Sequence, residues 1–301
     1  MKKVVLALAF AMATFVGFAQ EKAAKDSVTE GWKRAGNVLI TFNQSAFNKE
    51  WTGGGVGNTA ANILVNYDIN YKKGDWIWDN KIIADYGVNK NKGAERFTKN
   101  NDRLEFNSTA GKKASNNWYY SAYFNLRTQM DAGSVSFVND NNTPLDTSDD
   151  FNQDITTSHF FSPAYFQAGP GMLWKKSDNL FVNISPAAAK MIMVHKHFTE
   201  FGDAFGVEKG DAIRFELGAA VRGYAKFDIM KNISVENILA LYTNYLEDPQ
   251  NVDIDYTMNL AMQVNKYISA NLVFQAIYDD NAQPKGFQIR EAFGLGFNYA
   301  F

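Results

Sequence analysis

Three histidines and two nearby serines are the side chains that most resemble a nucleophile and its base. His159 lies between Ser158 and Ser162, and His195 and His197 follow later in the chain. A serine nucleophile needs an imidazole within hydrogen-bond reach, and that imidazole needs an orienting group. The spacing specifies neither contact, so we expect histidines at the rims and loops of the fold and predict no catalytic residue. A serine and a histidine that did meet would suggest a lipid hydrolase at the outer leaflet of a membrane, and we keep this as an alternative to the non-enzymatic functions considered below.

Metal ligands and phosphate-binding loops are also incompletely specified. His195-x-His197 has Glu200 or Asp203 nearby, but the sequence fixes no third ligand. The acidic stretch 140–154 is rich in oxygen ligands, yet it lacks the glycine and closing glutamate of an EF-hand loop. Gly53-Gly54-Gly55 is not followed by the lysine of a phosphate-binding loop. We therefore predict no metal and no cofactor, and a solvated exterior loop at the acidic stretch.

Composition excludes several classes of protein. The formal charge is −2 over 301 residues, so no basic excess is available to neutralise phosphates and nucleic acid is not an expected partner. Cysteine is absent, which removes disulfides, thiolate metal sites and a lipidated N-terminal cysteine. After the first twenty residues no apolar run approaches about 18 residues, so no transmembrane helix is expected.

The N-terminus has the pattern of a secretory signal. Lys2-Lys3 is followed by an apolar run to Phe18, and Gly17-Phe18-Ala19 offers small residues for cleavage. We predict a cleaved signal peptide at 1–19, a charged periplasmic lead-in at 20–35, and a single β domain at 36–301.

The last nine residues predict a strand with one apolar face. Large apolar side chains stand at every odd position, and glycine, asparagine or alanine at every even one. Side chains of a strand alternate between its two faces, so one face is a continuous aromatic and aliphatic stripe. Outer-membrane β-barrels end on strands of this kind. The stripe consists of Phe293, Leu295, Phe297, Tyr299 and Phe301.

Alternation of this type recurs in twelve segments from about Asn37 to the C-terminus. The segments at 118–130 and 252–264 alternate most regularly, whereas Pro163, Pro170 and Pro186 indicate bends or bulges. Short connections with aromatic residues on their shoulders alternate with long ones such as 131–158. Tight periplasmic turns, long exterior loops and aromatic girdles are typical of outer-membrane barrels.

These patterns predict an all-β fold: a transmembrane, antiparallel, up-and-down barrel of about twelve strands in the outer membrane. We expect a monomer that contacts outer-membrane lipid and lipopolysaccharide. We expect the barrel-assembly machinery to recognise the apolar stripe of the last strand, which is Phe293, Leu295, Phe297, Tyr299 and Phe301.

Several short motifs carry a resemblance to a known family. In chain order they are Trp51-Thr52-Gly53-Gly54-Gly55, Trp78-Asp79-Asn80, Tyr86-Gly87, Lys99-Asn100-Asn101-Asp102-Arg103-Leu104, Thr128-Gln129, Phe205-Gly206-Val207, Asn265-Lys266-Tyr267-Ile268, Tyr278-Asp279-Asp280 and the segment Glu291 to Phe301. With these motifs the chain resembles a family of uncharacterised outer-membrane barrels common in Bacteroidetes-type bacteria. The family has no assigned activity, so the resemblance implies the barrel and no substrate.

The same alternation predicts which charged residues line the barrel interior. They are Lys81, Arg103, Glu105, Arg127, Arg214, Glu216, Arg222, Asp253 and Asp255. Both signs recur around the wall, unlike the one-sided basic track of a pore for acidic sugars. Twelve strands lie between about eight, whose interior side chains fill, and about sixteen, which leave a channel. Two functions therefore stay open: a charge-paired structural barrel, or a narrow passive conduit for small polar solutes.

Overall fold

The computed structural model describes residues 30–48, 56–139, 151–279 and 286–301. Its folded unit is Gly31–Phe301. The predicted signal peptide at 1–19, the Trp51 to Gly55 motif and most of the acidic stretch, 140–150, lie outside the described residues. Within the described part of the chain, no helix combines the length and the apolar character needed to span a bilayer.

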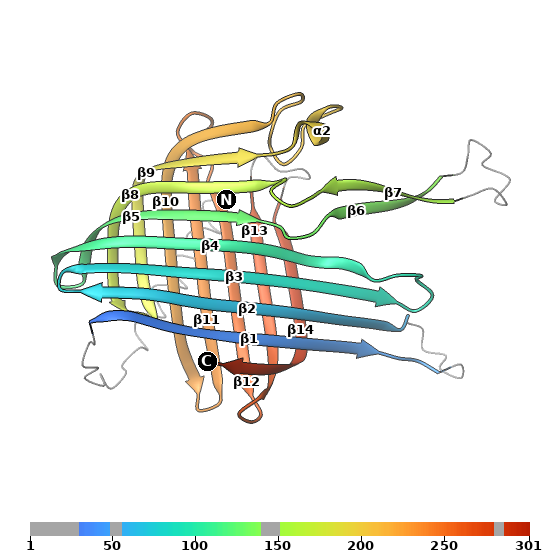
Figure 1. Cartoon of the computed structure of the whole chain (residues 1–301), viewed down its shortest axis with the longest axis horizontal. Coiled ribbons are helices and arrows are strands. Elements are labelled where there is room, and N and C mark those ends of the chain that lie inside the picture. The colour runs from blue at the N-terminus through green and yellow to red at the C-terminus, as the bar shows by residue number, and fades with distance from the viewer. Residues whose placement is uncertain (1–29, 49–55, 140–150, 280–285) are drawn as a thin grey trace. The chain divides into compact units, whose positions relative to one another are not determined.

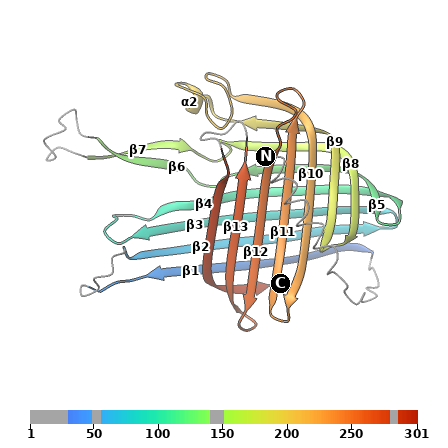
Figure 2. The same cartoon turned by 180° about the vertical axis from the view of Figure 1, so that it is seen from behind.

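Twelve antiparallel strands form one closed barrel (Figures 1 and 2), which confirms the predicted fold class. In chain order they are β1 (Gly31–Ser45), β2 (Asn58–Lys73), β3 (Trp76–Asn91), β4 (Thr98–Ser115), β5 (Trp118–Thr128), β8 (Ala164–Ser177), β9 (Leu180–Met193), β10 (Ile213–Met230), β11 (Ile233–Asn244), β12 (Asp253–Gln263), β13 (Ile268–Tyr278) and β14 (Gln288–Ala300). Each pairs with its neighbours in the chain, apart from one excursion between β5 and β8.

The first and last strands close the barrel. β1 pairs with β14 from Asn37 opposite Ala300 to Phe42 opposite Leu295. Beyond that ladder, the backbones of Gly36 and Phe301 exchange two hydrogen bonds of 2.8 and 2.9 Å. These bonds extend the β1–β14 ladder, and the pairing of the first barrel strand with the last closes the sheet.

The polarity of the wall is the reverse of that in a water-soluble barrel. On β14 the large side chains of Phe293, Leu295 and Phe297 are about half exposed, while Gly294 and Gly296 between them are buried. Many of the buried side chains elsewhere are polar, and they include Asn80, Asp85, Ser121, Asn125, Thr128, Asn183, Ser185, Glu216, Thr257, Ser269 and Asn271. Apolar surface thus covers the outside, and polar groups fill the interior.

Three details differ from the sequence-based expectation. β1 begins at Gly31, inside the predicted lead-in at 20–35, because Gly31 to Arg34 pair with the long end of β2. The predicted exterior loop at 131–158 contains a second, two-stranded sheet of β6 (Gly133–Asn139) and β7 (Phe151–Ser158). A single helical turn, α2 (Lys196–Thr199), follows β9 and is capped by the side chain of His195.

The proline-containing strands are irregular, as predicted. The register of β8 against β9 shifts between Ala168 and Met172, a segment that contains Pro170. The register of β10 against β9 shifts between Gly218 and Ala220, opposite the part of β9 that contains Pro186. Proline has no N–H to donate to a ladder, so pairing resumes only after an offset.

A substitution at Gly218 can test how closely β10 and β11 approach each other. A Cβ at this position would lie 1.7 Å from the carbonyl oxygen of Thr243, so backbone atoms must move. We expect Gly218→Ala to destabilise the refolded barrel by about 1–3 kcal/mol or to prevent folding. Urea unfolding in detergent micelles, followed by tryptophan fluorescence, measures the change. Gly202→Ala is the matched control because nothing lies within 4 Å of its Cβ position. Equal stability of the two variants would contradict the tight approach of β10 and β11.

Candidate functional site

Charged side chains from strands that are not neighbours meet inside the barrel. Nη1 of Arg127 on β5 lies 2.8 Å from Oδ2 of Asp255 on β12. These strands stand far apart in the closed strand order, so their side chains meet only through the interior. The ion pair therefore crosses the lumen, which is the space enclosed by the barrel wall.

A second crossing joins opposite sides of the wall nearer the short turns. Nζ of Lys81 on β3 lies 3.9 Å from Asp68 and 3.9 Å from Glu236 on β11. The Tyr224 hydroxyl donates to Glu236 at 2.7 Å, and Asn259 donates to its other oxygen at 2.8 Å. The carboxylate is thus held from several sides, as an ion withdrawn from water requires.

Glu105 on β4 is the centre of a third cluster. Arg103 and Arg222 approach its carboxylate at 3.8 and 3.7 Å, and Arg222 comes from β10 on the far side of the lumen. The side-chain amides of Asn107 and Asn125 donate to it at 2.9 and 2.8 Å. Two cations and two amides therefore surround one carboxylate.

Toward the long loops, a further network joins β9, β10 and β12. Nζ of Lys190 lies 3.1 Å from Asp253 and 3.3 Å from Glu216. Arg214 contacts Glu216 at 2.8 Å and Glu247 at 2.6 Å. Glu216 is only 2% exposed, so its two cations compensate a charge that is almost fully buried.

Two tyrosines form an aromatic layer between these clusters. Tyr123 and Tyr242 are 4% and 5% exposed and pack with Ala188 and Ala220 inside the barrel. The Lys190 ammonium lies 4.9 Å from the centre of the Tyr242 ring, within the range of a cation–π contact. Rings as well as ion pairs therefore occupy the interior.

All nine residues predicted to line the lumen take part in these ion pairs. Whether they line a passage stays a prediction. Sequence reasoning missed Lys190, because β9 passes through Pro186 and its alternation is interrupted. It also missed Arg290, although Arg290 shares the even-numbered face of Gly294 and Gly296.

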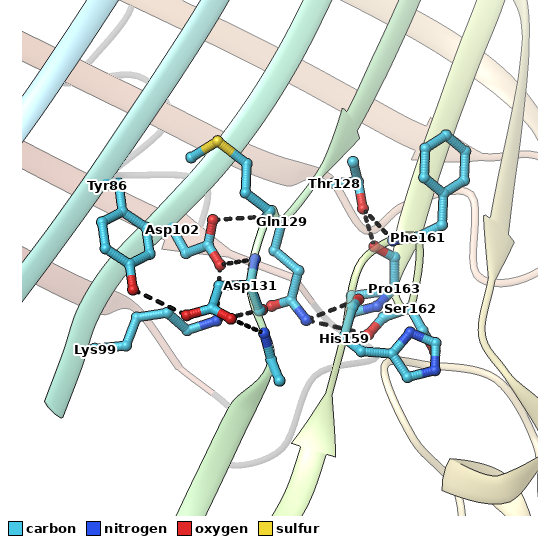
Figure 3. Close-up of polar contacts among 12 residues, drawn as sticks. Tyr86, Lys99, Asp102, Thr128, Gln129, Asp131, His159, Phe161, Ser162 and Pro163 are labelled. Carbon is cyan, nitrogen blue, oxygen red and sulfur yellow. Dashed lines mark hydrogen bonds and ion pairs between the residues drawn. The ribbon is translucent and has the colours of Figure 1, made fainter.

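A separate polar network anchors the β6–β7 hairpin to the barrel rim (Figure 3). The carboxylate of Asp102 accepts hydrogen bonds from the backbone N–H groups of Met130 and Asp131 at 2.8 and 2.9 Å. Lys99 contacts the same carboxylate at 2.7 Å. The Tyr86 hydroxyl donates to the Asp131 carboxylate at 2.9 Å. β3 and β4 thus hold the chain where it leaves β5.

Two of the serine and histidine candidates, His159 and Ser162, lie beside this network (Figure 3). Ser162 is 1% exposed, and its hydroxyl accepts from the backbone N–H of His195 at 2.8 Å. The rings of His159 and His195 are 5.6 Å apart. Among the described residues, no hydrogen bond joins an imidazole nitrogen to the Ser162 hydroxyl. The Ser162 hydroxyl is thus engaged by the backbone, and the hydrolase stays the alternative hypothesis.

His197 approaches Glu200 at 3.8 Å, next to α2. In the parts of the chain that the structure describes, no three metal-binding side chains converge on one point. The described contacts thus add no third ligand to the His195 and His197 pair.

The sequence resembles known proteins over part of its length. Residues 42–133 match the model of a family described as "Protein of unknown function (DUF3078)". Most motifs behind the expected family resemblance, from Trp51 to Gln129, fall inside this range. The distribution of the family among Bacteroidetes-type bacteria stays a prediction. No curated protein matches the sequence.

Several solved structures share the barrel architecture at low similarity. The translocator domain of the autotransporter NalP from Neisseria meningitidis is 10% identical with a TM-score of 0.38, covering 99% of this chain and 96% of that one. The COG4313 outer membrane channel from Pseudomonas putida F1 is 10% identical with a TM-score of 0.38, covering 93% and 98%. The Pseudomonas putida toluene transporter TodX is 7% identical with a TM-score of 0.34, covering 90% and 88%. Similarity this low carries no functional argument.

The crossing of Arg127 and Asp255 can be tested by a double-mutant cycle. Asp255→Asn leaves the arginine unpaired in a partly buried site, so we expect a loss of about 1–3 kcal/mol in unfolding free energy. Arg127→Gln combined with Asp255→Asn should cost less than the sum of the single changes. Urea unfolding in micelles measures all variants. Lys33→Gln is the control, because Lys33 is exposed and 4.0 Å from Asp178, and it should change stability by less than about 0.5 kcal/mol. Strict additivity would argue against the contact.

The rim network predicts a pH dependence at Asp131. The Tyr86 hydroxyl and the backbone N–H of Ala132 donate to the carboxylate and hold the pKa of Asp131 below its usual range. These bonds stabilise the rim above the ordinary carboxyl pKa, and their contribution is lost as pH falls through the lowered pKa. Tyr86→Phe should raise the pKa of Asp131, which NMR titration of its carboxyl carbon detects. Tyr245→Phe, whose hydroxyl contacts Pro186 instead, should leave it unchanged. An unaltered titration in Tyr86→Phe would refute this role of the hydroxyl.

Proposed function

We propose that this chain is an outer-membrane barrel that acts as a narrow passive conduit for small polar solutes, held nearly shut by its own ion pairs. The observation that carries the proposal is the reversed polarity of the wall. Exposed rings and aliphatic side chains cover the outside, and ion pairs cross the interior. An apolar exterior suits the hydrocarbon of a membrane, and a charged interior suits water and polar solutes.

The ion pairs limit the size of what passes. β3 and β11 lie on opposite sides of the strand order, yet Lys81 and Glu236 approach within 3.9 Å. Two side chains therefore span the interior at this level. Arg127 and Asp255 do the same nearer the long loops. A solute larger than a few atoms has to separate such pairs before it passes.

The charge pattern also limits selectivity. Acidic and basic side chains both face the interior and pair with one another, as Arg127 and Asp255 do. A strongly selective anion or cation pore instead presents a ring of one sign. The proposed conduit is therefore polar and only weakly selective.

The proposal includes contacts with the envelope around the barrel. The exterior apolar surface faces outer-membrane lipid, with lipopolysaccharide around the long loops. The last strand offers the assembly machinery a row of side chains that are 48–61% exposed, namely Phe293, Leu295, Phe297, Tyr299 and Phe301. The rings of Tyr267 and Phe297 stack at 5.7 Å beside the short turns, in keeping with an interfacial girdle.

Planar-bilayer recording of the refolded mature protein tests the conduit. The wild type should give small, infrequent conductance steps. Replacing both partners of one crossing, Arg127→Gln with Asp255→Asn, removes the bridge and should raise the step size severalfold. Lys33→Gln removes a charge outside the crossing and should leave the steps unchanged. If neither the wild type nor the double variant conducts, the barrel is a structural element and the conduit is refuted.

A further inference from the structure

Amide and guanidinium groups gather in the lumen at its loop end, the end with the long connections. Asn62 on β2, Asn101 and Arg103 on β4, and Arg290 on β14 all come from strand positions near that end. Nη1 of Arg290 donates to Oδ1 of Asn101 at 3.1 Å. Because β14 and β4 are not neighbours in the barrel, this contact also passes through the lumen. The ion pairs described above do not include Arg290.

Gly87 and a β-bulge create the space for this cluster. The register of β3 against β4 shifts from Gly87 opposite Asn101 to Val88 opposite Lys99, so Asn100 is an extra residue. A bulge of this kind redirects a side chain, and such bulges are common beside functional sites. A Cβ on Gly87 would lie 2.3 Å from Oδ1 of Asn62 and 2.5 Å from Oδ1 of Asn100. The glycine therefore makes room for amides that a side chain would displace.

Several polar atoms of the cluster are buried without a hydrogen-bond partner. They are Nε of Arg103, Nδ2 of Asn101 and Oδ1 of Asn62. Such orphaned groups are costly and rare in folded proteins, so each calls for an explanation. Two of the three are N–H donors. Together with the Arg290 guanidinium they form a surplus of donors.

The two guanidinium groups of the cluster differ in their carboxylate partners. Asp85 lies within electrostatic range of Arg290, whereas Arg103, a second cation near Arg290, approaches Glu105 at 3.8 Å. Asp85 also accepts a hydrogen bond from Asn62 at 2.7 Å. Among the described residues Arg290 has no carboxylate within ion-pair distance. The two guanidinium groups thus have more donor capacity than the local acceptors use.

We propose that Arg290, Arg103 and Asn101 form a binding subsite for the oxyanion group, carboxylate or phosphate, of a small polar solute. Guanidinium groups match the planar geometry of a carboxylate and the oxygens of a phosphate through paired N–H donors. The ligand supplies acceptors for the donors that the local groups leave without a partner, Nε of Arg103 and Nδ2 of Asn101. The subsite rests on the proposed conduit, in which it captures solute on the loop side of the ion pairs.

Isothermal titration of the full mature protein in micelles tests the subsite directly, without requiring conduction. Inorganic phosphate and acetate are titrated separately at constant ionic strength, so that the two arms distinguish the sources of the oxyanion. Arg290→Gln should weaken saturable binding by about tenfold or more, since a charge-assisted contact is lost. Gly87→Ala should also weaken binding, because the new Cβ displaces the amides of Asn62 and Asn100.

Arg34→Gln is the matched control, because it removes the same charge from an exposed side chain at the start of β1. Its binding should equal that of the wild type, and an unchanged unfolding midpoint shows that each variant is folded. The subsite is refuted if neither anion binds saturably, or if Arg34→Gln weakens binding as much as Arg290→Gln. Saturable anion binding without conductance would refute the conduit and support the subsite. Conductance without saturable anion binding would support the conduit and refute the subsite.

Discussion

Closure of the hydrogen-bonded wall is the constraint on which the rest of this structure depends. A bilayer offers no partners for backbone N–H and C=O groups, so a sheet survives there only when its two edges pair with each other. The exchange between Gly36 and Phe301 completes that pairing at the last residue of the chain. It also fixes which side chains of every strand point outward and which point into the lumen, because a register slip of one residue would exchange the two faces.

Because this orientation is fixed, charged side chains lie in the interior of the barrel, where burying a charge is costly. Once rings and aliphatic side chains face outward, charged residues must face a narrow enclosed space. A lone ion there is costly, and partners from across the lumen meet charges such as Asp255 and Glu105. Glu105, with two arginines and two amides around it, shows how far this compensation goes. Rigidity and narrowness of the interior therefore have the same cause.

The strand number, the closing strand and the polarity of its faces were predictable because alternation is a local property of the sequence. The β6–β7 hairpin was not, since its short strands carry no long apolar stripe. β1 starts earlier than expected because pairing with β2, not its own pattern, makes Gly31 to Arg34 extended. The sequence also could not predict which charged residues form ion pairs. Arg127 and Asp255 are far apart in the sequence, and only the closure of the barrel brings them together.

One short segment of β4, from Lys99 to Arg103, both anchors the β6–β7 hairpin at the rim and lines the lumen. Successive residues face opposite sides, so Asp102 can hold the rim while Arg103 beside it faces the lumen. The bulge at Asn100 separates the two registers: before it Lys99 joins Asp102 at the rim, and after it Asn101 lies opposite Gly87 in the lumen. A regular strand would send Asn100 to the face opposite Asn101. The extra residue therefore enriches the lumen in amides without releasing the hairpin anchor, and this explains why Tyr86-Gly87 and the Lys99 to Leu104 motif converge on one place.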